Sequence, residues 1–175
     1  MQNYLVVSAL IENSSEIIRE FSKLSKSSGC NIIDSRFKVF GHELSLMIFL
    51  TGTWDAIAKI EDMFGILAKK KQIKILTNRT TVDKLQGDSM PYAVDVVGLD
   101  QPGIIFDISD FMSSNNLIIH EMASNTYEAS ITGAKMFSLH IMVNISLDSS
   151  IASIRSDFIE FCDHLNLDAI MEPVK

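Results

Sequence analysis

Cysteine, basic charge and long apolar runs are all scarce in this chain of 175 residues, and each scarcity excludes a class of protein. The two cysteines, Cys30 and Cys162, are too few for a disulfide framework and lack the spacing of metal ligands, so we expect two buried thiols. No apolar stretch approaches the ~20 residues that span a bilayer. The N-terminus lacks the positive segment and the cleavage site of a signal peptide, and we expect a cytoplasmic protein without a membrane partner.

The charge balance is acidic, with a formal net charge of −7 and a pI near 5.0. Proteins that bind duplexes usually carry a basic surface, because neutralising phosphates supplies most of their non-specific affinity. The one basic cluster, at residues 68–72, ends a predicted helix, where cations suit the negative end of the helix dipole. We therefore expect no direct contact with nucleic acid.

Motifs of catalysis are also absent from the sequence. It contains no P-loop, no G-x-S-x-G elbow and no dinucleotide fingerprint. Its four histidines fall in different predicted elements without ligand spacing: His42, His120, His140 and His164. We expect no enzymatic activity, no metal and no cofactor.

What the chain does contain is a repeat. Apolar periodicity predicts the order βαββαβ in the first half, with strands at residues 4–9, 31–40, 44–51 and 73–77 and helices at 14–27 and 55–68. After a polar stretch the order restarts, with strands at 92–97, 117–126, 136–145 and 167–171 and helices at 102–114 and 149–166. The expected organisation is a first domain at residues 1–78, a linker at 79–91 and a second domain at 92–175.

Individual positions support the repeat. Ile104 follows Ile17 by 87 positions, and the same spacing relates Gly29 to Asn116. The second copy has a longer hairpin loop around residues 127–135. Two βαββαβ units predict an α+β fold of two ferredoxin-like sandwiches in tandem, each with an antiparallel sheet and helices on one face.

The other face of each predicted sheet is partly apolar. Met47 and Phe49 alternate away from the predicted core of the first copy, and Met142 does so in the second. Exposed apolar faces of this size favour a covering partner. Either the two domains cover each other or a second chain joins to give a homodimer, and the sequence leaves both open.

The stretch VVGLDQPGII at residues 96–105 combines a strand end with a helix start. We expect Asp100 to cap the helix and Pro102 to lie in its first turn, while Gly103 leaves the helix start open to close approach. Free amides at a helix start attract a carboxylate, and the Asp100 carboxylate attracts an ammonium, so the loop suits both ends of an α-amino acid. The alternative is a well-capped turn without a ligand.

This pattern, repeated as βαββαβ, resembles the ACT domain family of amino-acid-regulated proteins. In the first copy, GCNIIDSR at residues 29–36 and FLTGTWDAI at 49–57 are similar to the family of tandem-ACT repressors of the glycine cleavage system. The resemblance covers nearly the whole chain. It implies a domain that binds a small amino acid, with glycine as the first candidate, at an interface between domains or subunits and passes the signal to a partner.

The resemblance also implies where a ligand would bind. In the family, the loop before the first helix faces an asparagine at the start of the next domain's second strand. In this chain the implied site combines residues of the second copy with one of the first: Leu99, Asp100, Gln101, Pro102, Gly103, Ile104 and Asn31. If the domains pack side by side, these residues form one complete composite site.

The other implied site departs from the family pattern. Its loop has Glu16 in place of the glycine, where a negative charge repels a carboxylate, although Asn13 and Glu16 could still form a capping box. The facing position is Ile118 rather than asparagine. The expected degenerate site therefore comprises Asn13, Ser14, Ser15, Glu16 and Ile118. An alternative is that both sites have decayed, leaving a ligand-independent binding protein.

The expected function is that of an amino-acid-responsive regulator, a transcriptional repressor of the glycine cleavage system acting through a protein partner such as a DNA-binding activator. The alternative is an ACT-type regulatory subunit or adaptor that binds and tunes a metabolic enzyme. Both functions need a binding face and no catalytic group, so the sequence does not separate them.

Overall fold

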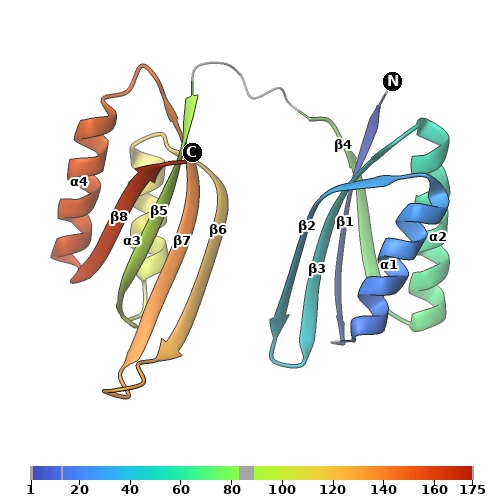
Figure 1. Cartoon of the computed structure of the whole chain (residues 1–175), viewed down its shortest axis with the longest axis horizontal. Coiled ribbons are helices and arrows are strands. Elements are labelled where there is room, and N and C mark those ends of the chain that lie inside the picture. The colour runs from blue at the N-terminus through green and yellow to red at the C-terminus, as the bar shows by residue number, and fades with distance from the viewer. Residues whose placement is uncertain (1, 13, 83–88, 175) are drawn as a thin grey trace. The chain divides into compact units, whose positions relative to one another are not determined.

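The computed structural model describes residues 2–12, 14–82 and 89–174. The chain divides into two compact units, residues 1–84 and 85–175 (Figure 1). No helix in the described residues is both long enough and apolar enough to cross a membrane.

The first unit is a four-stranded antiparallel sheet with two helices on one face (Figure 1). Its sheet order is β2-β3-β1-β4. Along the chain the elements are β1 (Asn3–Glu12), α1 (Ser15–Ser28), β2 (Asn31–Phe40), β3 (Glu43–Gly52), α2 (Trp54–Lys71) and β4 (Lys74–Thr80). The core between sheet and helices includes Leu5, Val7, Phe21, Ile48 and Phe64, each almost wholly buried.

The second unit repeats this architecture with the sheet order β6-β7-β5-β8. Its elements are β5 (Ser89–Leu99), α3 (Ile104–Ser114), β6 (Ile118–Glu128), β7 (Lys135–Ser146), α4 (Ile151–His164) and β8 (Leu167–Pro173). Val94, Ile108, Met112, Ile141 and Phe158 lie in its core. The predicted fold class, two ferredoxin-like sandwiches in tandem, is confirmed.

The backbone marks equivalent positions in the two units. Gly29 and Asn116 both adopt the left-handed conformation after the first helix of their unit, with φ of 83° and 55°. Gln72 and Asn166, 94 positions apart, do so after the second helix, with φ of 55° and 56°. These pairs fix an offset of 87 for the first helices and of 94 for the second helices.

Several predicted boundaries differ from the observed ones. β4 runs to Thr80 and β5 begins at Ser89, so both strands enter the stretch predicted as the 79–91 linker. The α3 helix begins at Ile104 rather than at residue 102. β4 and β5 are longer than predicted because hydrogen bonding to a neighbouring strand stabilises residues at the strand ends whose own pattern is polar.

The sheet faces opposite the helices are partly apolar, as predicted. Met47 is half exposed while its neighbours Leu46 and Ile48 are buried, and Met142 likewise lies on the face opposite Ile141.

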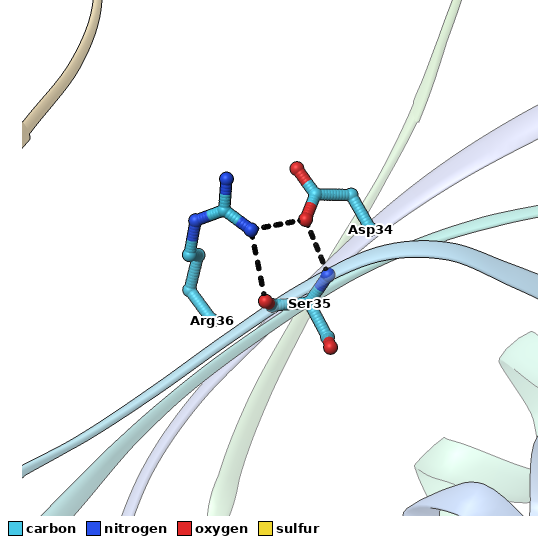
Figure 2. Close-up of polar contacts among 3 residues, drawn as sticks. All are labelled: Asp34, Ser35 and Arg36. Atoms are coloured by element: carbon cyan, nitrogen blue, oxygen red, sulfur yellow. Dashed lines mark hydrogen bonds and ion pairs between the residues drawn. The ribbon is translucent and has the colours of Figure 1, made fainter. Parts of the chain in front are cut away.

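Polar groups occupy the edge of the first sheet. In the edge strand β2, the Asp34 carboxylate accepts hydrogen bonds from the Ser35 amide, at 2.7 Å, and from the Arg36 guanidinium (Figure 2). Charged pairs on an edge strand disfavour pairing with other chains.

Candidate functional site

The loop between β5 and α3 follows Gly98, a glycine near the end of β5 that permits this strand to approach the start of β8 closely. A Cβ at Gly98 would collide with the Leu167 side chain and stand 3.2 Å from the Asn166 carbonyl oxygen. Just after the end of β5, the Asp100 amide donates a hydrogen bond to the Lys135 carbonyl at 2.9 Å, which extends the pairing of β5 with β7 by one residue. The loop therefore leaves the sheet in a fixed direction.

The prediction that Asp100 caps the helix is wrong. The residue at the N-cap of α3 is Gly103, with φ of 99°, and no side chain among the described residues caps this helix. A residue in this left-handed conformation cannot belong to a right-handed helix, so α3 cannot extend to residues before Gly103. Pro102 therefore lies in the preceding turn and not in the first helical turn. The exposed Asp100 carboxylate is consequently not used in capping, and the first amides of α3 lack a side-chain acceptor.

A second contact fixes the loop from the other side. The Gln101 side-chain amide donates to the Leu165 carbonyl at 3.3 Å, just after the end of α4. Behind the loop, Ile104 is almost completely buried and anchors the start of α3 in the core. The chain thus holds both ends of the Asp100–Gly103 turn in place.

A shallow pocket of about 250 Å³ lies at the start of α3. Loop and helix residues line one side and strand residues the other: Asp100, Gln101, Gly103, Ile104, Ile105 and Phe106, with Ser124 and Thr126 of β6 and Phe137 of β7. Phe106 is 72 % exposed, which is unusual for a large aromatic side chain. The pocket combines an acidic group, two hydroxyls and apolar walls.

Four of the predicted site residues line this pocket, namely Asp100, Gln101, Gly103 and Ile104. Leu99 is exposed at the end of β5 and Pro102 lies in the turn, and neither lines the pocket. Sequence reasoning missed Ile105, Phe106, Ser124, Thr126 and Phe137. The strand residues could have been predicted from the register of the hairpin, because Thr126 pairs with Phe137 and both side chains therefore lie on the same face of the sheet.

Asp100 is the one charged residue among the described residues that line the pocket, and a second carboxylate lies close to Gly103. Asp107 lies in the first turn of α3, and its Oδ2 atom is 3.8 Å from the position that a Cβ on Gly103 would occupy. A carboxylate near a helix start is stabilised by the helix dipole and competes with an external anion for the same amides. The pocket therefore suits an ammonium group at Asp100 better than it suits a free carboxylate at the amides.

The equivalent loop of the first unit is built differently. α1 is capped at Ser14, so the capping box predicted for Asn13 and Glu16 is wrong in placing the cap at Asn13, whose position lies outside the described residues. Ser15 is already the first helical residue. Glu16 lies 3.8 Å from the Lys71 ammonium, so a cation partly offsets the negative charge that was expected to repel a ligand there.

The two facing residues lie at corresponding places in their own units. Asn31 begins β2 and lines a depression of about 430 Å³ together with Ser25, Gly29 and Cys30. Ile118 begins β6 and is exposed. The pairing of the Asp100 loop with Asn31, and the loss of the site that includes Ile118, stay predictions. A double-mutant cycle of Asp100→Ala with Asn31→Ala checks the pairing, and strictly additive effects on ligand affinity would refute it.

Metal and thiol chemistry find no support in the described residues. No three His, Cys, Asp or Glu side chains of this part of the chain gather as metal ligands would. Both cysteines are buried and free, as predicted. Burial raises the pKa of the Cys162 thiol to about 12, with a smaller contribution from the Asp163 carboxylate, so this thiol stays protonated near neutral pH.

The geometry of the first unit, βαββαβ with a polar loop at the first helix, corresponds to a known domain model. Residues 3–77 match the family model of the ACT domain. The N-terminal unit therefore resembles the ACT domain over these residues. The second unit has the same topology and equivalent backbone landmarks, which makes it an ACT-like repeat.

Relatives extend the similarity across both ACT-like units. The chain is 28 % identical over 165 residues to the glycine cleavage system transcriptional repressor of Escherichia coli (strain K12), covering 94 % of this chain and 87 % of the relative. The repressor of the same name from Shigella flexneri matches equally. The recognition of a repressor-like tandem ACT protein from the sequence is therefore confirmed as a similarity.

Solved structures confirm the fold over the whole chain. A crystal structure assigned to a glycine cleavage system transcriptional repressor covers 100 % of this chain and 99 % of its own, with a TM-score of 0.71 and 21 % identity. A protein of unknown function from Galdieria sulphuraria covers 100 % of both chains, with a TM-score of 0.78 and 18 % identity. At these identities the likeness concerns the arrangement of the elements.

Proposed function

We propose that this chain is an amino-acid-responsive regulator that represses transcription of the glycine cleavage system through a protein partner, without contacting DNA itself. The similarity to the bacterial repressors along 94 % of the chain supports the regulatory role. The ligand is a small amino acid, with glycine as the first candidate, and the proposed binding residues are those of the Asp100–Gly103 loop with the neighbouring Leu99 and Ile104.

One observation carries the proposal of a ligand at this loop. The Asp100 carboxylate is exposed at the mouth of a pocket while the first amides of α3 have no side-chain cap in the described structure. An ammonium group would pair with this carboxylate, and the volume of the pocket, about 250 Å³, favours a small ligand. The Ser124 and Thr126 hydroxyls on the opposite wall can supply further hydrogen bonds to a polar ligand.

The decisive experiment is thermal unfolding of the full chain against a panel of amino acids, with glycine and serine first. A ligand at ~100 times its Kd stabilises the fold by about 2.7 kcal/mol. For a chain of this size that corresponds to a shift of roughly 5–10 °C, at about 2–4 °C per kcal/mol. We expect a shift for one small amino acid, because its ammonium pairs with Asp100.

Two variants make the result specific. Asp100→Ala should abolish the shift, whereas Asp168→Ala, which removes an exposed carboxylate on β8 outside the pocket, should retain it. A shift that survives in Asp100→Ala would contradict the proposed site. If no amino acid shifts the melting temperature, the chain is a ligand-independent adaptor.

The nature of the partner needs a separate measurement. Affinity capture from native cytosol should retain a DNA-binding regulator if the chain represses transcription. Capture of a metabolic enzyme in its place would favour the alternative of a regulatory subunit. Direct binding to duplex DNA would appear as an affinity that falls steeply with salt, and it would refute the proposed mechanism.

A further inference from the structure

A groove between α1 and α2 of the first unit is open and mainly apolar. It has a volume of about 240 Å³, and its floor consists of Leu24, Met63, Ile66 and Leu67. We refer to it as the α1–α2 groove. Ile66 lies well within α2 rather than at its end, and its side chain is 66 % exposed. An exposed aliphatic side chain beside an apolar depression is typical of a docking surface.

Cations border the α1–α2 groove on both sides. Lys23 of α1 and Lys70 of α2 line it, and within the described residues neither ammonium has an ion-pair partner. The one acid in the lining, Glu20, lies 3.5 Å from the Lys71 ammonium, which also lies 3.8 Å from Glu16, so this cation offsets the Glu20 charge only in part. The groove therefore presents an apolar floor inside a rim of net positive charge.

Aromatic side chains occupy the same location in the second unit. By the offsets of 87 and 94, Leu24 corresponds to Phe111 and Leu67 to Phe161. The rings of Phe111 and Phe161 pack with their centroids 5.0 Å apart, and Phe111 also contacts Phe158. Aromatic side chains therefore pack between α3 and α4 at positions where aliphatic residues line an open groove between α1 and α2.

The rim is reversed in charge as well. Lys23 corresponds to Asp110, and the floor residues Met63 and Ile66 correspond to Asp157 and Glu160. Equivalent helix surfaces are therefore apolar and basic in the first unit and acidic in the second. The contrast extends to each unit as a whole, since residues 1–84 carry 12 Lys and Arg against 9 Asp and Glu, and residues 85–175 carry 3 against 13.

We propose that the α1–α2 groove docks an amphipathic helix of the protein partner, one whose apolar stripe is flanked by carboxylates. The charge of the rim selects the occupant, because an acidic helix pairs with both lysines and a basic helix is repelled. A large apolar side chain of the helix enters the groove beside Ile66. This inference rests on the proposed function for the existence of a protein partner and adds where that partner binds.

The test uses the full chain and a designed probe. The probe is a fluorescent peptide of about 18 residues, roughly five helical turns, with leucines at helical spacing and glutamates on either side of them. Its matched control replaces every glutamate by lysine. Fluorescence anisotropy should show saturable binding of the acidic peptide, weakening as salt rises, and no saturable binding of the basic peptide.

Variants locate the binding. Ile66→Glu introduces the residue that the second unit has at this position, and we expect a loss of affinity of at least about tenfold, the range for a central interface residue. Lys23→Asp should weaken binding and reduce its salt dependence. The matched control is Leu76→Glu, which places the same charge at a residue 71 % exposed on the open sheet face of the same unit and should leave binding unchanged.

Three results would overturn the inference: equal binding of both peptides, equal affinity of wild type and Ile66→Glu, or a loss caused by Leu76→Glu. A fourth result that would overturn the inference is self-association of the wild type, measured by sedimentation, that Ile66→Glu abolishes. The groove would then be a contact between copies of this chain. The amino-acid-induced melting shift separates this inference from the proposed ligand site. Ile66→Glu should keep that shift, and its absence in wild type would refute the ligand site without touching the peptide result.

Discussion

At the scale of single residues, two glycines within regular elements have opposite roles. A methyl group on Gly98 of β5 would collide with Leu167, whereas a methyl group on Gly65 of α2 would meet nothing within 4 Å. We expect Gly98→Ala to lower the free energy of unfolding by about 1–3 kcal/mol through overpacking. Gly65→Ala should raise it by about 0.5–1 kcal/mol, because alanine is the better helix former. Urea denaturation checks both, and a stable Gly98→Ala variant would contradict the close approach of β5 and β8.

Cys162 provides a second prediction at this scale. Its pKa is raised to about 12 by burial, so very little thiolate exists at pH 8 in the folded protein. When the protein unfolds, the pKa of this thiol returns to its ordinary value near 8.5, and the thiol then ionises readily. We expect Cys162 to react with a thiol reagent only after denaturant is added, measured as the release of a chromophore from Cys30→Ser protein. Rapid modification under native conditions would contradict the buried position.

At the scale of elements, helix caps differ in a way that stability measurements can detect. The Thr53 side chain accepts a hydrogen bond from the Ala56 amide at 3.2 Å and caps α2. Ser14 caps α1 without such a bond in the described structure. Thr53→Ala should therefore cost about 1 kcal/mol of stability and Ser14→Ala much less. Equal costs in urea denaturation would show that the capping bond contributes nothing.

Elements whose pattern is set by burial could be predicted from the sequence. Alternation in β3 and β7 places Leu46 and Ile141 in the core, and the structure confirms both. The same patterns predicted the repeat, the two sandwiches and the partly apolar sheet faces. Helix starts were harder, because the α3 start depends on the left-handed backbone of Gly103 rather than on hydrophobicity. A Pro-Gly pair fits both a first helical turn and a tight turn that precedes the helix.

The candidate site could be predicted only in part, for a related reason. Residues consecutive in the loop, such as Asp100 and Gln101, were identified from their order along the chain. Ser124 and Thr126 reach the same pocket from a strand more than 20 positions away, through a register that pairing with β7 determines. Asp107 places a further negative charge near the helix start, and its closeness to Gly103 depends on the backbone of this turn.

At the scale of the whole molecule, the net charge of −7 conceals an uneven distribution. Counted by unit, residues 1–84 have a net charge of +3 and residues 85–175 have −10. The average charge of the chain therefore excludes a nucleic-acid partner less firmly for the first unit than for the whole chain. Two lysines of this unit, Lys23 and Lys70, border the apolar α1–α2 groove. Like charges within the second unit repel one another and oppose its folding.

Screening by salt should act on the two units differently. Raising NaCl from low to moderate concentration weakens repulsion among the carboxylates of the second unit, which is worth a few tenths to about 1 kcal/mol if several exposed like-charge pairs contribute about 0.3 kcal/mol each. The first unit should change little, because its charges nearly balance. Hydrogen exchange of the full chain checks this by comparing amides of the central strands β5 and β7 with those of β1 and β3. Equal gains in protection in both sheets would point to a general effect of salt on folding rather than to the separation of charge between the units.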